Sequence, residues 1–253
     1  MGKNLNIENQ LKNYKKKRSF ILFFIFGALI FIISFVVFFE FILKINMDIM
    51  SLIYLILALA YLIMVLTLRS RIVFYSMNIN YFSMLNDRLG LIYLDQPILD
   101  DEWIKHNLLT DYDKIVETDY YLFSKIYKKT KYIVNRGELF LGVVVAKNEK
   151  VDFYSAKLGM QIDKIIDKHP RQKHVKKQIV LQFKSYEKYS DEALDDAKKI
   201  ICFQEQGNFI INITIAYFKD LNAVYYLRPI KRYPNRYYFY GVKLIEALIG
   251  VIE

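Results

Sequence analysis

Three residues around one predicted strand have the types that could hold a metal ion and activate water. The strand spans residues 178–186 and carries Gln182 and Lys184, which share one of its faces because they are two residues apart. Asp152 lies upstream in a second predicted strand, residues 151–155. Asp152, Gln182 and Lys184 are the candidate catalytic residues because of the short motif to which Gln182 and Lys184 belong.

The run Ile179-Val180-Leu181-Gln182-Phe183-Lys184 resembles an element of restriction-endonuclease-like nucleases, a hydrophobic strand followed by Glu or Gln, any residue, and Lys. The resemblance implies that Asp152 and Gln182 would hold Mg²⁺ and that Lys184 would help to activate water. It covers only these residues, and a predicted helix separates Asp152 from Gln182 where the nuclease motif has a hairpin. The in-and-out alternation of a half-exposed strand also produces such a pair. A membrane-tethered nuclease is therefore the alternative function, and a non-enzymatic role is the main expectation.

Two basic stretches are candidate binding sites for a phosphate-bearing partner. Residues 168–177 form a predicted loop that is rich in cations and contains no acid, and residues 228–236 interleave cations with tyrosines. Near a membrane, anionic lipids attract each basic side chain by about 1 kcal/mol, whereas basic and aromatic residues together suit single-stranded nucleic acid. The main expectation for both stretches is a solvated loop. Within the binding hypothesis, we expect anionic lipid headgroups ahead of nucleic acid. The candidate binding residues are Lys168, Arg171, Lys173, Lys176, Lys177, Arg228, Lys231 and Arg232.

Other catalytic and metal-binding patterns are absent from the sequence. It contains no GxGxxG, P-loop, GxSxG, HExxH or CxxC motif. His169 and His174 flank Pro170 at a spacing that is poor for shared metal ligation. The single cysteine, Cys202, excludes a disulfide framework, and we expect it to be a buried thiol. We therefore expect no cofactor and no metal site.

The elements that must position these residues form a predicted α+β domain, residues 91–253. From residue 131 onward, strands and amphipathic helices follow one another in the order β-β-β-α-β-α-β-β-α. This order lacks the strict alternation of a doubly wound sheet and the helix-free run of a sandwich, so it predicts a mostly antiparallel sheet packed by helices. Three helices are predicted: residues 156–168, which Pro170 ends, residues 191–201, which Ser190 caps, and residues 242–252. Residues 131–135 and 138–147 are predicted to form a hairpin whose second strand is apolar on both faces and therefore central, and a further strand is predicted at residues 237–240.

The segment before this domain has the composition of a membrane anchor. Apolar residues make up 54% of the chain, which excludes a disordered protein, and they concentrate in residues 20–39 and 49–68. An apolar helix of about 20 residues crosses a hydrocarbon core of about 30 Å. We therefore predict a transmembrane hairpin, residues 19–68, with spans at about residues 19–43 and 48–68. A helical stalk, residues 69–90, is predicted to continue the second span.

The basic residues around the spans predict the orientation of this hairpin. The net charge is +10, and residues 1–18 hold much of the excess. A cationic cluster precedes the first span, and Arg69 and Arg71 follow the second, whereas the connector has one lysine between two acids. By the positive-inside rule, both termini face the cytoplasm.

The same features favour a binding function. The spans carry almost no polar side chains, which disfavours transport. We expect a multi-pass protein of the cell membrane, in contact with membrane lipids. Its cytoplasmic domain is expected to bind another membrane or membrane-associated protein.

Overall fold

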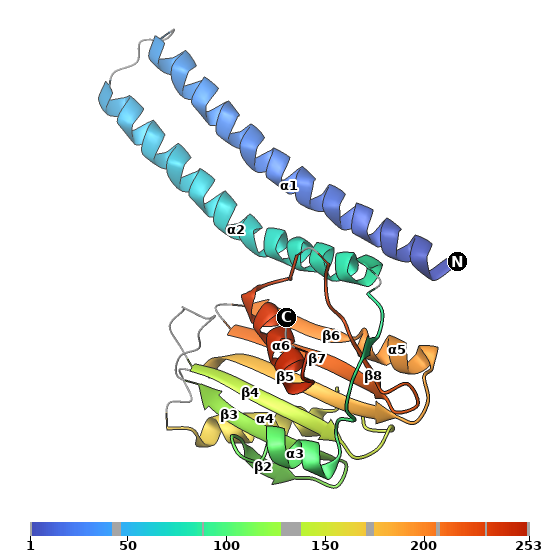
Figure 1. Ribbon diagram of the computed structural model, residues 1–253. Helices are drawn as coiled ribbons and strands as arrows, with labels where there is room; N and C mark the ends of the chain where they lie inside the picture. Colours follow the sequence, from blue (N-terminus) through green and yellow to red (C-terminus); the bar gives the residue numbers. More distant parts are fainter. Residues whose placement is uncertain are drawn as a thin grey trace. The chain divides into compact units, whose positions relative to one another are not determined.

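The computed structural model describes residues 2–41, 47–87, 89–127, 138–170, 175–205, 208–230 and 232–251. The chain divides into two units, Met1–Asn86 and Asp87–Glu253, and each is described by itself. In the described residues, the first unit is helical and the second holds a sheet with helices (Figure 1).

The first unit is a hairpin of two long antiparallel helices, α1 (Gly2–Phe41) and α2 (Met47–Asp87) (Figure 1). At 1.5 Å per residue each is about 60 Å long, roughly twice the thickness of a hydrocarbon core. Half-buried residues recur along α1 at alternating steps of three and four residues, the spacing of helices packed along their length. The residues of this row are Ile7, Leu11, Tyr14, Arg18, Ile21, Ile25, Ala28, Ile32, Phe35 and Phe39, and Leu22 and Val36 beside it are also half-buried.

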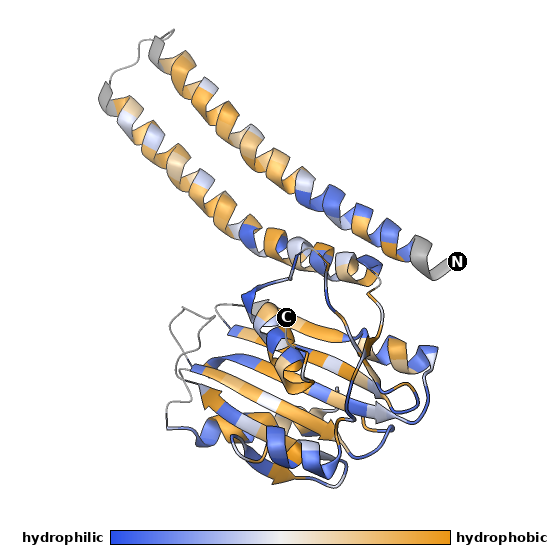
Figure 2. Ribbon diagram, in the orientation of Figure 1, coloured by the Kyte–Doolittle hydropathy of each residue, from blue (hydrophilic) through white to orange (hydrophobic). Residues whose placement is uncertain are grey.

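The polar halves of the two helices also pack against each other. The ring of Tyr14 in α1 stacks 5.6 Å from the ring of Phe82 and lies 6.0 Å from that of Tyr75, both in α2. α2 runs unbroken from its apolar part through residues 69–87. Figure 2 shows the apolar stretches of both helices and a hydrophilic stretch in the N-terminal half of α1.

In the second unit, the described residues form a mixed sheet of eight strands with helices on both faces. The elements are β1 (Ile92–Tyr93), α3 (Asp101–Asn107), β2 (Asp113–Val116), β3 (Tyr120–Tyr127), β4 (Glu138–Ala146), α4 (Ala156–Lys168), β5 (Val175–Tyr186), α5 (Asp191–Ala197), β6 (Ile200–Glu205), β7 (Asn208–Phe218), β8 (Ala223–Tyr226) and α6 (Arg236–Leu248). The strand order is β1-β8-β7-β5-β4-β3-β2, and β6 also pairs with β7. Antiparallel pairs predominate, which confirms the predicted α+β class, but the central strands β4, β5 and β7 are parallel.

The parallel centre follows from the connections between its strands. Parallel neighbours need a crossover, which α4 provides between β4 and β5, and α5 with β6 provides between β5 and β7. Both crossovers advance across the sheet in the same direction, so their common right-handedness places α4 and α5 on one face. α6 covers the other face, where a Cβ on Gly241 would lie 3.0 Å from Ile213 and 3.4 Å from Ile179.

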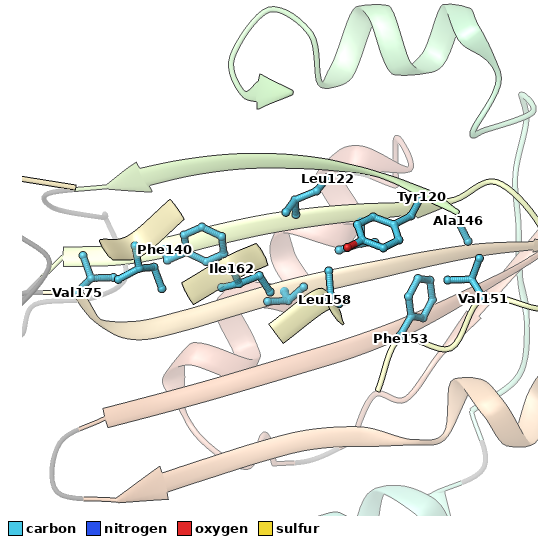
Figure 3. Close-up of a cluster of buried hydrophobic side chains, with 12 residues drawn as sticks. Tyr120, Leu122, Phe140, Ala146, Val151, Phe153, Leu158, Ile162 and Val175 are labelled. Atoms are coloured by element: carbon cyan, nitrogen blue, oxygen red, sulfur yellow. The ribbon is translucent and has the colours of Figure 1, made fainter. Parts of the chain in front are cut away.

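One hydrophobic core lies between α4 and the sheet. Figure 3 shows Leu158 and Ile162 of α4 packed toward Phe140, Leu122 and Tyr120 of the strands. Every residue of β4 is buried, which confirms the prediction of a central strand that is covered on both sides. Residues 131–135, the strand predicted to pair with it, lie outside the described residues. Among the described residues, β4 pairs with β3 and β5.

Two predicted strands are not strands in the structure. Residues 151–155 form a turn because the Asp152 carboxylate accepts the backbone N–H of Tyr154 at 2.9 Å, and α4 begins directly after Ser155. Residues 237–240 belong to α6. The Asn235 side chain accepts the N–H of Tyr238 at 2.8 Å and so caps the helix ahead of this aromatic run.

One predicted helix is shorter than expected. Ser190 caps α5 as predicted, with its hydroxyl oxygen accepting the N–H of Ala193 at 3.2 Å. The helix ends at Ala197, however, and Ile200 begins β6 instead of continuing the apolar stripe. Pairing with β7 satisfies the backbone groups of this segment, with Ile200 opposite Ile213. Cys202 therefore lies in a strand.

Candidate functional site

The candidate catalytic residues come to one face of the sheet, the face that α4 and α5 cover. Gln182 and Lys184 lie on β5 with their side chains on this face, and Asp152 lies in the turn before α4. Tyr154 of that turn links the two elements. Its hydroxyl group is 3.3 Å from the Thr214 hydroxyl, and Thr214 donates to Gln182 Oε1 at 3.2 Å.

The charged end of Lys184 is paired with a carboxylate that the sequence analysis did not single out. Lys184 Nζ donates to Asp196 Oδ2 at 2.9 Å, and the Tyr186 hydroxyl donates to the same oxygen at 3.1 Å. Lys199 Nζ donates to Asp196 Oδ1 at 3.0 Å. The Lys184 side chain is only 7% exposed, and its ammonium lies 5.2 Å from the centre of the Phe153 ring. This lysine is therefore a buried cation that joins β5 to α5.

The electrostatics of this cluster favour ionised Asp196. Burial works against the charged carboxylate, but the hydrogen bonds from Lys184, Lys199 and Tyr186 outweigh it and hold the pKa of Asp196 below its usual value. Burial and the neighbouring Asp196 carboxylate raise the pKa of Tyr186. The tyrosine therefore stays protonated and keeps its hydroxyl donor at neutral pH.

The two proposed metal ligands have different surroundings. Gln182 is fully buried, and its Nε2 has no hydrogen-bond partner among the described residues. Asp152 is exposed, and one of its oxygens caps its own turn. Among the described residues, no three His, Cys, Asp or Glu side chains lie close enough to hold a metal ion. On this face of the sheet, the cluster therefore consists of Lys184, which is paired with Asp196, and the buried amide of Gln182.

The first basic stretch does not form one continuous loop. Lys168 is the last residue of α4, and β5 already begins at Val175, three residues before the predicted strand. Lys176 is exposed on that strand, whereas Lys177 is buried on the opposite face. Arg171 and Lys173 lie outside the described residues.

Lys177 lies against an aromatic ring instead of facing a solvent-exposed patch. Its ammonium is 5.6 Å from the centre of the Tyr237 ring of α6, and burial lowers the pKa of this lysine. In the second basic stretch, Arg228 is half-buried with its guanidinium 5.5 Å from the centre of the Tyr226 ring. Arg232 is exposed, and Lys231 lies outside the described residues. In the part of the chain that the structure describes, Lys168, Lys176 and Arg232 are thus the exposed members of the predicted set.

Sequence reasoning missed Asp196 and Tyr154 as members of the polar cluster. Asp196 stands twelve residues after Lys184, on the helix of a crossover connection, and nothing in the local pattern links the two. Only the return of α5 over the sheet brings the carboxylate to the ammonium. Tyr154 was hidden for the same reason, because its segment was predicted to be a strand and not a turn.

The first unit carries a second kind of feature, two helices that are long and apolar enough to cross a membrane. The candidate segments are Asn6–Phe39 and Ile49–Asp87. Large apolar side chains along them are exposed, with Phe23 at 77% and Leu55 at 67%. Exposed apolar surface of this extent marks a membrane or protein contact.

Comparison with protein-family models, with curated proteins and with solved structures finds no match to this chain.

Proposed function

We propose that the chain is a membrane-anchored protein whose cytoplasmic α+β domain binds another protein of the membrane or its surface. The observation that carries the proposal is the exposed apolar surface of α1 and α2, over lengths that match a bilayer. Burying this surface in lipid removes it from water, which is the dominant favourable term for such side chains. The basic residues beside each span support an orientation with both termini in the cytoplasm.

The anchoring part of the proposal is tested by extraction and by topology. The full chain should stay with membranes at alkaline pH and dissolve only in detergent. A reporter that is active only outside the cytoplasm, fused after Glu253, should be silent. A chain recovered in the aqueous fraction would contradict the anchor, and an active reporter would contradict the orientation.

The binding part is tested with the exposed cations of the domain. Lys168 and Lys176 lie on adjacent elements, α4 and β5, and both are exposed. In-cell cross-linking of the full chain should join this region to a defined protein. Reversing both charges (K168E and K176E) should abolish that cross-link, whereas the matched change at Lys105 and Lys188 should preserve it. Equal cross-linking by both variants would refute this surface as the contact.

The alternative function, a Mg²⁺-dependent nuclease, has less support from the geometry. Its lysine is held in an ion pair with Asp196, and its amide is engaged by Thr214. The direct test is nuclease activity of the purified chain with Mg²⁺, compared with the variant Asp152→Asn. Activity that the variant loses would establish the enzyme in place of the binding protein.

A further inference from the structure

The apolar halves of α1 and α2 enclose an open groove of about 500 Å³ along one side of the hairpin. Its wall runs from Phe20 to Ile32 on α1 and from Ala60 to Met64 on α2. The groove exists because small residues stand at its middle. Gly27 has no side chain, Ala60 faces it from α2, and a Cβ added to Gly27 would meet nothing within 4 Å.

The length of the groove matches one leaflet of a bilayer. From Phe20 to Ile32 the helix rises about 18 Å at 1.5 Å per residue. Half of a hydrocarbon core of about 30 Å is about 15 Å. A lipid chain entering at Phe20 would therefore end close to the far end of the groove.

Cations stand at the polar end of the same groove. Lys16 and Lys17 precede Phe20 by four and three residues, so they continue the groove face of α1. Arg71 follows Met64 by seven residues, which places it on the groove face of α2. All three cations are exposed. The contact of Tyr14 with Tyr75 fixes the pairing of the helices so that Arg71 lies at the level of the two lysines.

No acid neutralises this end of the groove. The sequence contains no Asp or Glu from residue 9 to residue 39, nor from residue 49 to residue 86. The groove thus combines an apolar length with a cationic mouth, which is the complement of an anionic amphiphile.

We propose that this groove binds one anionic phospholipid, with its phosphate at Lys16, Lys17 and Arg71 and an acyl chain along Gly27. The inference rests on the membrane anchoring proposed above. A second copy of the chain is a poorer occupant, because a copy in the same orientation would bring its own cations to the same depth and repel these. An anionic lipid neutralises them and fills the hollow at Gly27.

The headgroup part is tested on the full chain in nanodiscs made from equal amounts of phosphatidylglycerol and phosphatidylcholine with identical acyl chains. Lipids retained after gentle detergent transfer are quantified by mass spectrometry. We expect about tenfold enrichment of phosphatidylglycerol, equivalent to ~1.4 kcal/mol. The triple variant K16Q/K17Q/R71Q should lose this enrichment. The control K12Q/K15Q/R69Q removes the same charge from a position about two turns before Phe20 and from the opposite faces of α1 and α2, and it should keep the enrichment.

The acyl part is tested by filling the groove. A Cβ at Gly27 would meet nothing within 4 Å, so Gly27→Phe should place a ring in the hollow and reduce the retained lipid at least fivefold, whichever headgroup it carries. Leu29→Phe adds a similar ring on the opposite face of α1 and should leave retention unchanged. Circular dichroism confirms that each variant keeps its helix content.

The outcomes separate the possible ligands and the two proposals. Inorganic phosphate and glycerophosphoglycerol at millimolar concentration should not displace the lipid, and displacement would identify a free-phosphate site instead. Equal retention of both lipids by the native chain, or equal loss in the two triple variants, would overturn the inference. Alkaline extraction of the same samples is read alongside, so a chain that stays in the membrane without selecting a lipid refutes only this inference.

Discussion

Replacing Asp196 by Ala should leave the buried ammonium of Lys184 without its ion-pair partner. The variant leaves Lys184 with its side chain 7% exposed and without its carboxylate, and it removes the acceptor of the Tyr186 hydroxyl. Breaking a buried ion pair on one side costs about 3–5 kcal/mol. Because the Asp196 side chain is 24% exposed, water can partly replace it, and we expect a loss of about 2–4 kcal/mol in the free energy of unfolding.

The single tryptophan of the chain allows this loss to be measured in the intact protein. Trp103 is buried against Phe183, and its Nε1 donates to the Leu248 carbonyl oxygen at 3.0 Å. Its fluorescence during a urea titration in mild detergent therefore reports unfolding of the second unit. With a slope of about 2 kcal/mol per molar urea, Asp196→Ala should lower the midpoint by roughly 1–2 M.

A matched variant and a double variant make the test decisive. Lys199 donates to the same carboxylate, but its side chain is 62% exposed, so Lys199→Ala should cost less than about 1 kcal/mol. Adding Lys184→Met to Asp196→Ala removes the unpaired buried charge and should restore at least about 1.5 kcal/mol of the free energy of unfolding. If Asp196→Ala costs no more than Lys199→Ala, the buried pair does not stabilise the domain and the reasoning fails.

The same pair predicts a pH dependence with a definite sign. The pKa of Asp196 is lower in the folded chain than its usual value, so the unfolded chain binds its proton more readily. The stabilisation is therefore present above the unfolded pKa of about 4 and is lost as the pH falls toward the folded one. The difference in midpoint between the native chain and Asp196→Ala should be constant from pH 7 to pH 5 and shrink below about pH 4.

Three further predictions concern packing, reactivity and autonomy of the domain. Gly241→Leu should destabilise the second unit by about 1–3 kcal/mol in the same urea titration, because a Cβ there already meets Ile213 at 3.0 Å. Burial raises the pKa of the Cys202 thiol to about 11, so iodoacetamide at pH 8 should alkylate it at least about tenfold more slowly than a free cysteine. A chain that begins at Leu91 should melt cooperatively without detergent, since it retains the whole sheet and the core around Phe140; strong dye binding and a broad melt would contradict this.

Local signals were sufficient wherever neighbouring residues decide the structure. The amphipathic spacing of residues 156–168, followed by Pro170, predicted the bounds of α4, and Ser190 marked the start of α5. The two apolar runs predicted α1 and α2 because an uninterrupted apolar run of about 20 residues indicates a helix without any information from other segments of the chain. In each case, the propensity, the cap and the hydrophobic period agree.

Long-range contacts decided the remaining features. Ile200 and Ile201 fit an apolar helix stripe as well as a strand, and pairing with β7 selected the strand. Lys177 looked like one cation of a loop, but the alternation of β5 turned it toward the aromatic ring of Tyr237. Asp196 reaches Lys184 only because a right-handed crossover returns α5 to the sheet face. The sequence alone therefore determined the two long apolar helices, the α+β class and the bounds of α4. The tertiary structure decided which charges are buried, since burial depends on residues far apart in the chain.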